Sequence, residues 1–224
     1  MMGITTRSLS TSSSEIYELR TYNIHPNKLK DYVSLTVNDF GPRIEKSKPL
    51  GFWLVELGGL NQALHIWPYD SVAHRSSVRS ELAQSQEWNS RYLSKAGSFF
   101  QHMENSLLLS AGKQSPQERI LKDCPLYEIH SHHMIKNNWS DSLEDFLNAD
   151  FSNQQNGVST LVGAFQTVCG QLDTVTLLWQ HKNHDGVASL RRTLDDLHEY
   201  KTLRDYSDRI NTKVLSPFIT SHWK

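Results

Sequence analysis

The sequence is poor in cysteine, in net charge and in long apolar runs, and each shortage excludes a class of protein. Its 224 residues include only Cys124 and Cys169, too few for a disulfide framework and not spaced like metal ligands, so we expect both thiols to be reduced. Lysine and arginine number 23 against 24 aspartates and glutamates, which leaves no excess of positive charge for nucleic-acid phosphates. No apolar run approaches the roughly 18 residues of a membrane-spanning helix. We therefore predict no nucleic-acid partner and no transmembrane segment.

Motifs of several enzyme classes are missing as well. The chain has no glycine-rich phosphate loop, no nucleophile elbow and no recognisable metal-ligand spacing. We therefore predict no catalytic residue, no metal and no cofactor. With 38% hydrophobic and 21% charged residues, the composition is that of a soluble globular protein. A chain of this length buries roughly 70% of the surface that its unfolded form exposes, so it needs neither disulfide nor metal to fold.

The first fourteen residues, MMGITTRSLSTSSS, differ from the rest in composition. They are rich in serine and threonine, contain no acidic residue and include a single arginine. A secretory signal would need an apolar core, which this segment lacks. Two interpretations stay open for it, a disordered tail and the end of a mitochondrial targeting peptide.

A twenty-residue stretch, Gly51 to Asp70, returns in altered form at Gly163 to Lys182. Under an offset of 163 − 51 = 112 residues, the residues kept in both copies include Gly51 and Gly163, Gly58 and Gly170, Leu60 and Leu172, Asn61 and Asp173, and Trp67 and Trp179. Glycine and asparagine tolerate the positive φ of tight turns, so each copy is typical of a β-hairpin. The repeated tryptophans are most simply core anchors of the hairpins. We attribute the retention of the whole set to packing and turn geometry.

The order of secondary structure around the two hairpins is also repeated. Period-two alternation predicts the strands, and apolar residues at helical spacing predict the helices between them. In the first half the expected elements are a strand at 16–22, a helix after Pro26 that ends or kinks at Gly41-Pro42, strands at 52–57 and 62–69, a helix capped by Asp70 or Ser71, a looser segment around Trp88 and Tyr92, and a strand at 99–109. In the second half they are a strand at 126–134, a helix from Trp139, a hairpin over 158–181, a helix from Val187 to Leu197 and a strand at 214–223.

Two β-α-β-β-α-β units predict an α+β protein made of tandem ferredoxin-like domains. We place the N-terminal segment at 1–14, the first domain at 15–110, a polar linker at 111–124 and the second domain at 125–224. Each unit covers one face of a four-stranded sheet with two helices and leaves the other face bare. Because a bare apolar face must be buried, we expect the halves to pack sheet to sheet as a pseudo-dimer that closes an α+β barrel.

Side chains of the first strand and the hairpin of each unit are candidates for a pocket inside this barrel. The more apolar Tyr17 and Leu19 should pack on the helices, which would turn the polar side chains of the same strand toward the barrel interior. The set that we expect to line an interior pocket is Glu18, Arg20, Tyr22, His65, Trp67, Tyr69, Glu128, His130, His132 and Trp179. Aromatic walls with a few polar groups suit a small organic ligand or haem. The alternative is that the charged groups pair with one another and specify how the halves dock.

Two further groups of side chains allow both a binding role and a structural one. His130, His132 and His133 lie within four residues, so they could ligate a metal or haem, although histidine is also common on half-buried strands. One helical turn separates Arg75 from Arg79. Such a pair could bind an anion or an acidic partner, or it could belong to an ordinary solvated helix face.

Six short motifs of the first half form a recognisable set. They are YELRTY at 17–22, GFW at 51–53, HIWPYD at 65–70, AHR at 73–75, VR at 78–79 and HME at 102–104. Together they resemble the NIPSNAP family of mitochondrial proteins, in particular its third subgroup. The resemblance covers the chain from Glu15 onward and is weaker in the second half, where Leu177 and Gln180 stand at the positions of His65 and Pro68.

The resemblance implies a dimeric-α+β-barrel-like fold, an association with mitochondria, and protein partners without a transferable catalytic motif. The leading hypothesis is a non-enzymatic adaptor or scaffold of the NIPSNAP type, in mitochondrial quality control or vesicle traffic. The alternative is a binder of a small apolar molecule or haem, or a monooxygenase-like enzyme, that uses the barrel interior. Cytoplasm is the alternative location, and the oligomeric state stays open. An interior filled by Trp67 and Trp179 would argue against the alternative function, whereas an open cavity lined by the predicted polar residues would favour it.

Overall fold

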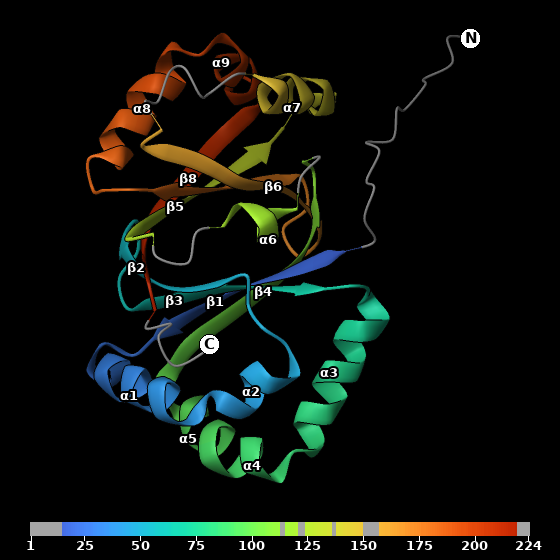
Figure 1. Cartoon of the computed structure of the whole chain (residues 1–224), viewed down its shortest axis with the longest axis vertical. Coiled ribbons are helices and arrows are strands. Elements are labelled where there is room, and N and C mark those ends of the chain that lie inside the picture. Colours follow the sequence, from blue (N-terminus) through green and yellow to red (C-terminus); the bar gives the residue numbers. More distant parts are fainter. Residues whose placement is uncertain (1–14, 113–114, 121–123, 136–137, 150–156, 219–224) are drawn as a thin grey trace.

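The computed structural model of the chain describes residues 15–112, 115–120, 124–135, 138–149 and 157–218 (Figure 1). Eight antiparallel strands form a closed barrel in the order β1-β3-β2-β8-β5-β7-β6-β4. Figure 1 shows the helices of the first half below the strands and those of the second half above them. The predicted architecture, an α+β barrel built from two β-α-β-β-α-β units, is confirmed. Within the described residues, no helix is both long and apolar enough to cross a membrane.

The first half follows the predicted order. Its principal elements are β1 (Ile16–Ile24), α1 (Leu29–Asp39), α2 (Gly41–Lys46), β2 (Gly51–Leu57), β3 (Gln62–Tyr69), α3 (Val72–Gln84) and β4 (Phe100–Ser110). The predicted break at Gly41-Pro42 separates α1 from α2, because proline suits the first turn of a helix and not its interior. Ser71 caps α3 by accepting a hydrogen bond of 3.1 Å from the backbone N–H of His74.

The segment between α3 and β4 is helical, so the prediction of a looser segment is wrong. It consists of α4 (Gln86–Trp88), the π-helical turn η2 (Asn89–Leu93), α5 (Ser94–Ala96) and the 3-10 turn η3 (Gly97–Phe99). Elsewhere in the first half, the 3-10 turn η1 (Pro26–Lys28) precedes α1. Trp88 and Tyr92 are buried, with their rings stacked 4.6 Å apart. Because they lie four residues apart, they share one helical face and anchor the segment to the core.

The second half repeats this order, with one displaced boundary and a helix at 198–204 that was not predicted. Its elements are β5 (Leu126–Met134), α7 (Trp139–Asn148), β6 (Ser159–Cys169), β7 (Thr174–His181), α8 (Gly186–Asp196), α9 (His198–Arg204) and β8 (Ser207–Pro217). The short helix α6 (Pro116–Arg119) precedes them, within the predicted linker. The last strand therefore begins at Ser207 and not at position 214. Most side chains of its first part, Asp208 to Thr212, are exposed, so no apolar alternation marks it in the sequence. Positions 219–223 of the predicted strand lie outside the described residues.

Two seams join the halves of the barrel. At one seam β2 pairs with β8, from Trp53 opposite Pro217 to Leu57 opposite Val214. At the other seam β4 pairs with β6, and Ser110 lies opposite Phe165. Each seam contains four residue pairs. Among the described strands, the first parts of β4 and β8 consequently have a partner strand on one side only.

The described residues form three hydrophobic cores, one inside the barrel and one beneath each helix layer. The large residues of the barrel core are Tyr17, Trp53, Tyr127 and Phe165. Their rings pack across the two sheets, with centroid separations of 5.0 Å and 5.3 Å. Trp67 belongs to the core beneath the helices of the first half, and Trp179 belongs to that of the second half. The repeated tryptophans therefore hold each sheet to its own helices, while other aromatic residues hold the two sheets together.

Turn geometry accounts for several residues that both hairpins keep. The residues with positive φ are Gly58 (82°) and Asn61 (54°) in the first turn and Gly170 (115°) and Asp173 (56°) in the second. Gly58 also lies against the backbone of Thr212 in β8, where a side chain would collide. Packing accounts for the buried tryptophans. It does not account for Leu60 and Leu172, which are exposed, so that part of the prediction is wrong.

Replacing Trp67 by alanine is expected to lower the free energy of unfolding by about 3–5 kcal/mol. Trp67 is 1% exposed, and the Arg43 guanidinium lies 3.5 Å from its ring centroid, so the substitution removes core volume and a stacking partner. Urea denaturation followed by circular dichroism measures the change. Leu60→Ala, at an exposed hairpin tip, is the control and should change stability by less than about 0.5 kcal/mol. A Trp67→Ala protein as stable as the unmodified chain would contradict the core assignment.

Candidate functional site

The predicted site residues lie between the sheets and the helices, so the prediction that they face the barrel interior is wrong. Tyr17 and Leu19, the set predicted to face the helices, pack in the barrel core. Tyr22, Trp67 and Tyr69 pack beneath the helices of the first half. The remaining candidates also lie on the side of their strands that faces the helices. They are Glu18, Arg20, His65, Glu128, His130, His132 and Trp179. The helices bury one face of each strand and the opposite sheet buries the other face. The polarity of the side chains alone therefore does not identify the face that meets the barrel interior.

In the first half, the charged candidates are neutralised by one another and by α3. Glu18 is 1% exposed, and its Oε1 accepts hydrogen bonds from Arg75 Nη2 at 2.6 Å and from Asn105 Nδ2 at 2.8 Å. Arg20 Nη1 lies 3.9 Å from the same oxygen. Burial raises the pKa of Glu18, but Arg75, Arg20 and Asn105 outweigh it and hold the pKa below its ordinary value. The geometry supports the pairing interpretation here, and Arg75 has a structural partner, whereas Arg79 is exposed.

A second buried cluster surrounds Trp67. The indole N–H of Trp67 donates a hydrogen bond to Nδ1 of His65, and the Arg43 guanidinium stacks on the indole ring. Arg43 Nη2 also donates to the hydroxyl of Tyr69 at 2.9 Å. Burial, assisted by the charges of Arg20 and Arg43, lowers the pKa of His65 well below its ordinary value. His65 is therefore neutral at neutral pH and serves as a hydrogen-bond acceptor.

In the second half, Glu128 has imidazoles beside it where Glu18 has arginines. His130 Nε2 lies 2.8 Å from Glu128 Oε1, and His181 Nε2 lies 3.3 Å from Oε2. Burial raises the pKa of Glu128, but the two imidazoles outweigh burial and lower the pKa to about 2. The carboxylate is therefore ionised throughout the neutral range.

A serine extends this cluster in a way that the sequence did not reveal. Ser159 Oγ lies 2.8 Å from His181 Nδ1, so serine, histidine and carboxylate follow the order of a hydrolase triad. Both Ser159 and His181 are buried, however, and Ser159 Oγ lies 3.3 Å from the carbonyl oxygen of Gly186, to which it can donate. This geometry ties the hydroxyl to the first turn of α8 and gives it a structural role.

The three neighbouring histidines of β5 do not converge on one point. The rings of His130 and His132 lie on the helix-facing side with centroids 6.5 Å apart, whereas His133 lines the barrel interior. His132 packs edge-on against Tyr200 of α9 at 5.6 Å. Burial, with the charges of His130 and His133, lowers the pKa of His132 to about 3. In the part of the chain that the structure describes, no group of three histidine, cysteine or acidic side chains is placed to hold a metal ion.

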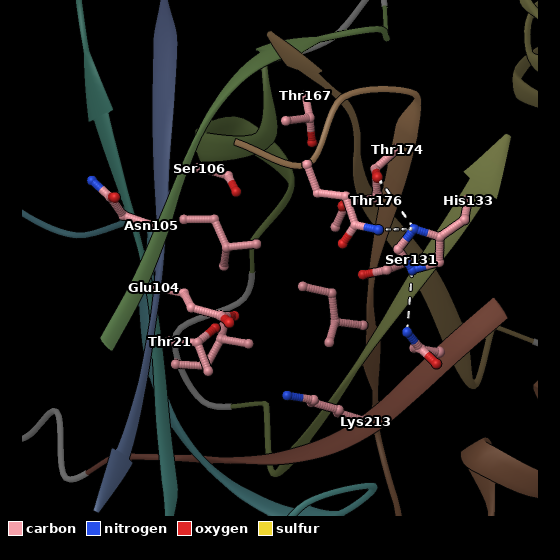
Figure 2. Close-up of a pocket in the computed structure, with 15 residues that line it drawn as sticks. Thr21, Glu104, Asn105, Ser106, Ser131, His133, Thr167, Thr174, Thr176 and Lys213 are labelled. Carbon is pink, nitrogen blue, oxygen red and sulfur yellow. Dashed lines mark hydrogen bonds between the residues drawn. The ribbon is translucent and has the colours of Figure 1, made fainter. Parts of the chain in front are cut away.

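The barrel interior holds a cavity of about 170 Å³ beside the aromatic core (Figure 2). Leu19, Leu64 and Ile129 form its apolar part. Its polar wall includes Thr21, Glu104, Ser131, His133, Thr176 and Lys213, which come from five strands. Figure 2 shows Thr21 and Glu104 on one side of the cavity and Ser131 and Thr176 on the other. The interior is therefore filled by aromatic rings at one end and lined by hydrogen-bonding groups at the other.

Two titratable groups of this wall are held by amides. Gln171 Nε2 lies 2.9 Å from His133 Nδ1, and burial lowers the pKa of His133. Lys213 Nζ donates to Gln62 Oε1 at 2.7 Å. Burial lowers the pKa of Lys213, while the Glu104 carboxylate acts in the opposite direction. The cavity thus offers donors, acceptors and both signs of charge, which suits a small polar molecule.

None of the ten predicted site residues is in the lining of this cavity. Its polar residues occupy the alternate positions of the same strands: Thr21 lies between Arg20 and Tyr22, and Ser131 lies between His130 and His132. Considering both faces of each strand would have identified them. That the predicted residues bind a ligand stays a prediction.

Comparison with known proteins gives a family match over nearly the whole described chain. The family model described as NIPSNAP matches residues 17–113 and 127–221. NipSnap homolog 3B of Mus musculus is 34% identical over 188 residues, which cover 80% of this chain and 72% of the mouse protein. NipSnap homolog 3A of Homo sapiens is 30% identical over 183 residues, which cover 78% of this chain and 70% of the human protein.

Among solved structures, a candidate monooxygenase from Fusobacterium nucleatum has the same fold. It superposes with a TM-score of 0.64 over 92% of this chain and 94% of its own, at 11% sequence identity. A likeness at this level of identity concerns the fold alone. It agrees with the eight-stranded barrel of two tandem units described above.

The stability of the protein is expected to fall as the pH is lowered from about 6.5 to about 3, by up to about 1.4 kcal/mol per pH unit for each buried histidine involved. The pKa of His132 is lowered to about 3 in the folded protein, so the unfolded chain binds more protons in this range. Urea denaturation at several pH values measures the slope. His132→Gln should reduce it, whereas the exposed control His102→Gln should leave it unchanged. A slope that His132→Gln does not alter would contradict this assignment.

Proposed function

The chain belongs to the NIPSNAP family, and we propose that it acts as a non-enzymatic, mitochondria-associated adaptor. In this proposal it binds protein partners through its two hairpin tips, the turns at residues 58–61 and 170–173. The barrel is the rigid scaffold of this proposal, and the tips are its contact points. Mitochondrial quality control and vesicle traffic are the processes in which such an adaptor would work. The composition of residues 1–14, which lie outside the described residues, supports a mitochondrial association.

The observation that carries the proposal is the exposure of the same leucine in both hairpins. Leu60 is 80% exposed and Leu172 is 60% exposed, at positions related by the 112-residue offset of the repeat. Their neighbours Asn61 and Asp173 are explained by positive φ, and the repeated tryptophans are explained by burial. A leucine kept twice on the surface stabilises neither turn nor core, and exposed apolar residues that gather into a patch mark protein contact sites.

The two tips lie at the same end of the barrel. Gln171, beside Leu172, lines the barrel cavity, and Gln62, two residues after Leu60, holds Lys213 in the wall of that cavity. Leu57 and Val168, at the ends of the strands that lead into the two turns, are exposed apolar residues as well. A partner segment with apolar side chains, lying across this end of the barrel, would contact both tips at once.

Proximity labelling in cells tests this function with the double variant Leu60→Asn, Leu172→Asn. The unmodified chain, fused to the labelling enzyme, is expected to label mitochondrial proteins, and the double variant is expected to lose most of that set while its melting temperature stays the same. The control is Val72→Asn, Leu93→Asn, which alters exposed apolar residues on the helix layer. If the tip variant labels the same proteins as the unmodified chain, the tips are not the contact site. If neither labels mitochondrial proteins, the mitochondrial assignment is wrong.

The second candidate function is binding of a small polar molecule in the barrel cavity. The observation in its favour is the polar wall with Glu104, His133 and Lys213. At about 170 Å³ the cavity is smaller than the roughly 300–1,000 Å³ of common ligand pockets. This size and polarity favour a small polar molecule over haem or an apolar ligand.

Titration with haem is therefore expected to give no shift of the Soret band at micromolar protein. The cavity is too small for the porphyrin and offers it a polar wall. Visible absorbance spectroscopy measures the result, and Thr176→Phe, which fills the cavity, is the control. A Soret shift that disappears in Thr176→Phe would restore the haem hypothesis.

A further inference from the structure

A second cavity, of about 300 Å³, lies outside the barrel between the sheet of the second half and the first turn of α8. Its wall includes the carboxylates of Glu128 and Asp185, together with His130, Val187, Arg191 and Thr212. His130 is 2% exposed, and its Nδ1 has no hydrogen-bond partner among the described residues. The cavity thus combines an ionised carboxylate with a buried polar atom that is left unpaired.

The internal repeat shows which part of the first half corresponds to this cavity. Glu18 and Glu128 lie directly opposite the repeated tryptophans in β3 and β7. Two residues further along these strands, Arg20 lies opposite Asn105 in the first half and His130 lies opposite Thr212 in the second half. The floor of the cavity in the second half therefore matches the strand residues around Glu18.

The helices complete the correspondence. The buried residues of α3 are Val78 and Leu82, and those in the matching positions of α8 are Leu190 and Leu194. The differences, 190 − 78 and 194 − 82, both equal 112, the offset of the hairpins. The same offset places Val187 where α3 has Arg75, since 75 + 112 = 187.

This replacement removes a permanent positive charge from the second half. In the first half, Arg75 donates to Glu18 at 2.6 Å. In the second half, Val187 carries no charge and the cavity adjoins Glu128. The nearby Arg191 pairs with Asp195 at 3.2 Å and so does not take the place of Arg75. Beside Glu128 lie the imidazoles of two strand residues, His130 at 2.8 Å and His181 at 3.3 Å, and neither is supplied by α8 as Arg75 is supplied by α3.

We propose that this cavity binds a guanidinium or primary ammonium group of a ligand, which takes the position that the Arg75 side chain occupies in the first half. Glu128 accepts its hydrogen bonds and supplies the opposite charge, and the hydroxyl of Thr212 occupies the place of the Asn105 amide. A guanidinium fits better than an ammonium, because its planar set of donors can reach several acceptors at once. The cation can belong to a small free molecule or to an arginine side chain.

Titration with ethylguanidinium chloride at about pH 8 tests the proposal. Sodium chloride at equal ionic strength is the salt control, and NMR of the His130 ring reports binding. The expected result is saturable binding of one probe in the millimolar range, with ethylammonium binding more weakly. Glu128→Gln should weaken binding by about tenfold or more, since it removes the charged acceptor. Absence of saturation, or binding that Glu128→Gln does not weaken, would overturn the proposal.

Two further variants keep the test decisive if Glu128→Gln does not fold. Val187→Arg supplies the missing guanidinium within the chain, so it should abolish binding of the probe and raise the melting temperature. Binding that persists in a folded Val187→Arg protein would overturn the proposal. Arg75→Ala opens the matching space beside Glu18, so the number of bound probes should rise from one to two and the probe should restore part of the lost melting temperature.

A second titration distinguishes the two sources of the cation. N-acetyl-arginine-N-methylamide carries the same guanidinium on a peptide backbone. Binding of both probes supports a site that accepts an arginine side chain, whereas binding of ethylguanidinium alone supports a site for a small free molecule. Failure of both probes would overturn the proposal without affecting the adaptor function, which depends on the hairpin tips.

Discussion

Burial of both faces of the strands is the constraint on which the rest of this structure depends. The inner face of each sheet packs against the other sheet, and the outer face packs against helices, so the chain has three cores in place of one. Every residue of β7 is buried, including its threonines, a glutamine and a histidine. Polar side chains in such a structure cannot be left to solvent, and each must find a partner, line a cavity or stay neutral.

The two halves meet this requirement in different ways. In the first half, α3 supplies Arg75 to the Glu18 carboxylate, and Arg43 of α2 stacks on the ring of Trp67. In the second half, histidines replace arginines around Glu128, and α8 leaves a cavity at the corresponding place. The inside of the barrel is different again, with aromatic rings at one end and polar groups at the other. The two halves thus resemble each other more in backbone structure than in the arrangement of their charges.

The architecture could be predicted because hairpins need particular residues at particular places. Positive φ at Gly58 and Asn61, and burial of Trp67, recur at the same spacing in the second half, and the order of elements follows from that repeat. The direction of the side chains could not be predicted, because alternation separates two faces without saying which one meets the helices. The start of β8 could not be predicted either, because most of its first residues are exposed and polar and show no apolar alternation.

The candidate sites were harder to predict than the fold for a related reason. The barrel cavity gathers residues as distant in sequence as Thr21 and Lys213, and only closure of the barrel brings them together. The cavity beside Glu128 depends on what a helix lacks, and it becomes visible only when α8 is compared with α3. The exposed leucines were found in the sequence, but their exposure follows from the position of the hairpin tips beyond the cores.

The joining of both halves in one chain has a consequence for how such a barrel can change over generations. In a barrel assembled from two identical subunits, every substitution appears twice, so a change that suits one site is imposed on its symmetry mate as well. A duplicated and fused chain is free of that coupling. One half can keep the arginine that stabilises its sheet while the other half loses it, and a new binding surface can then arise next to an intact copy that keeps the barrel folded.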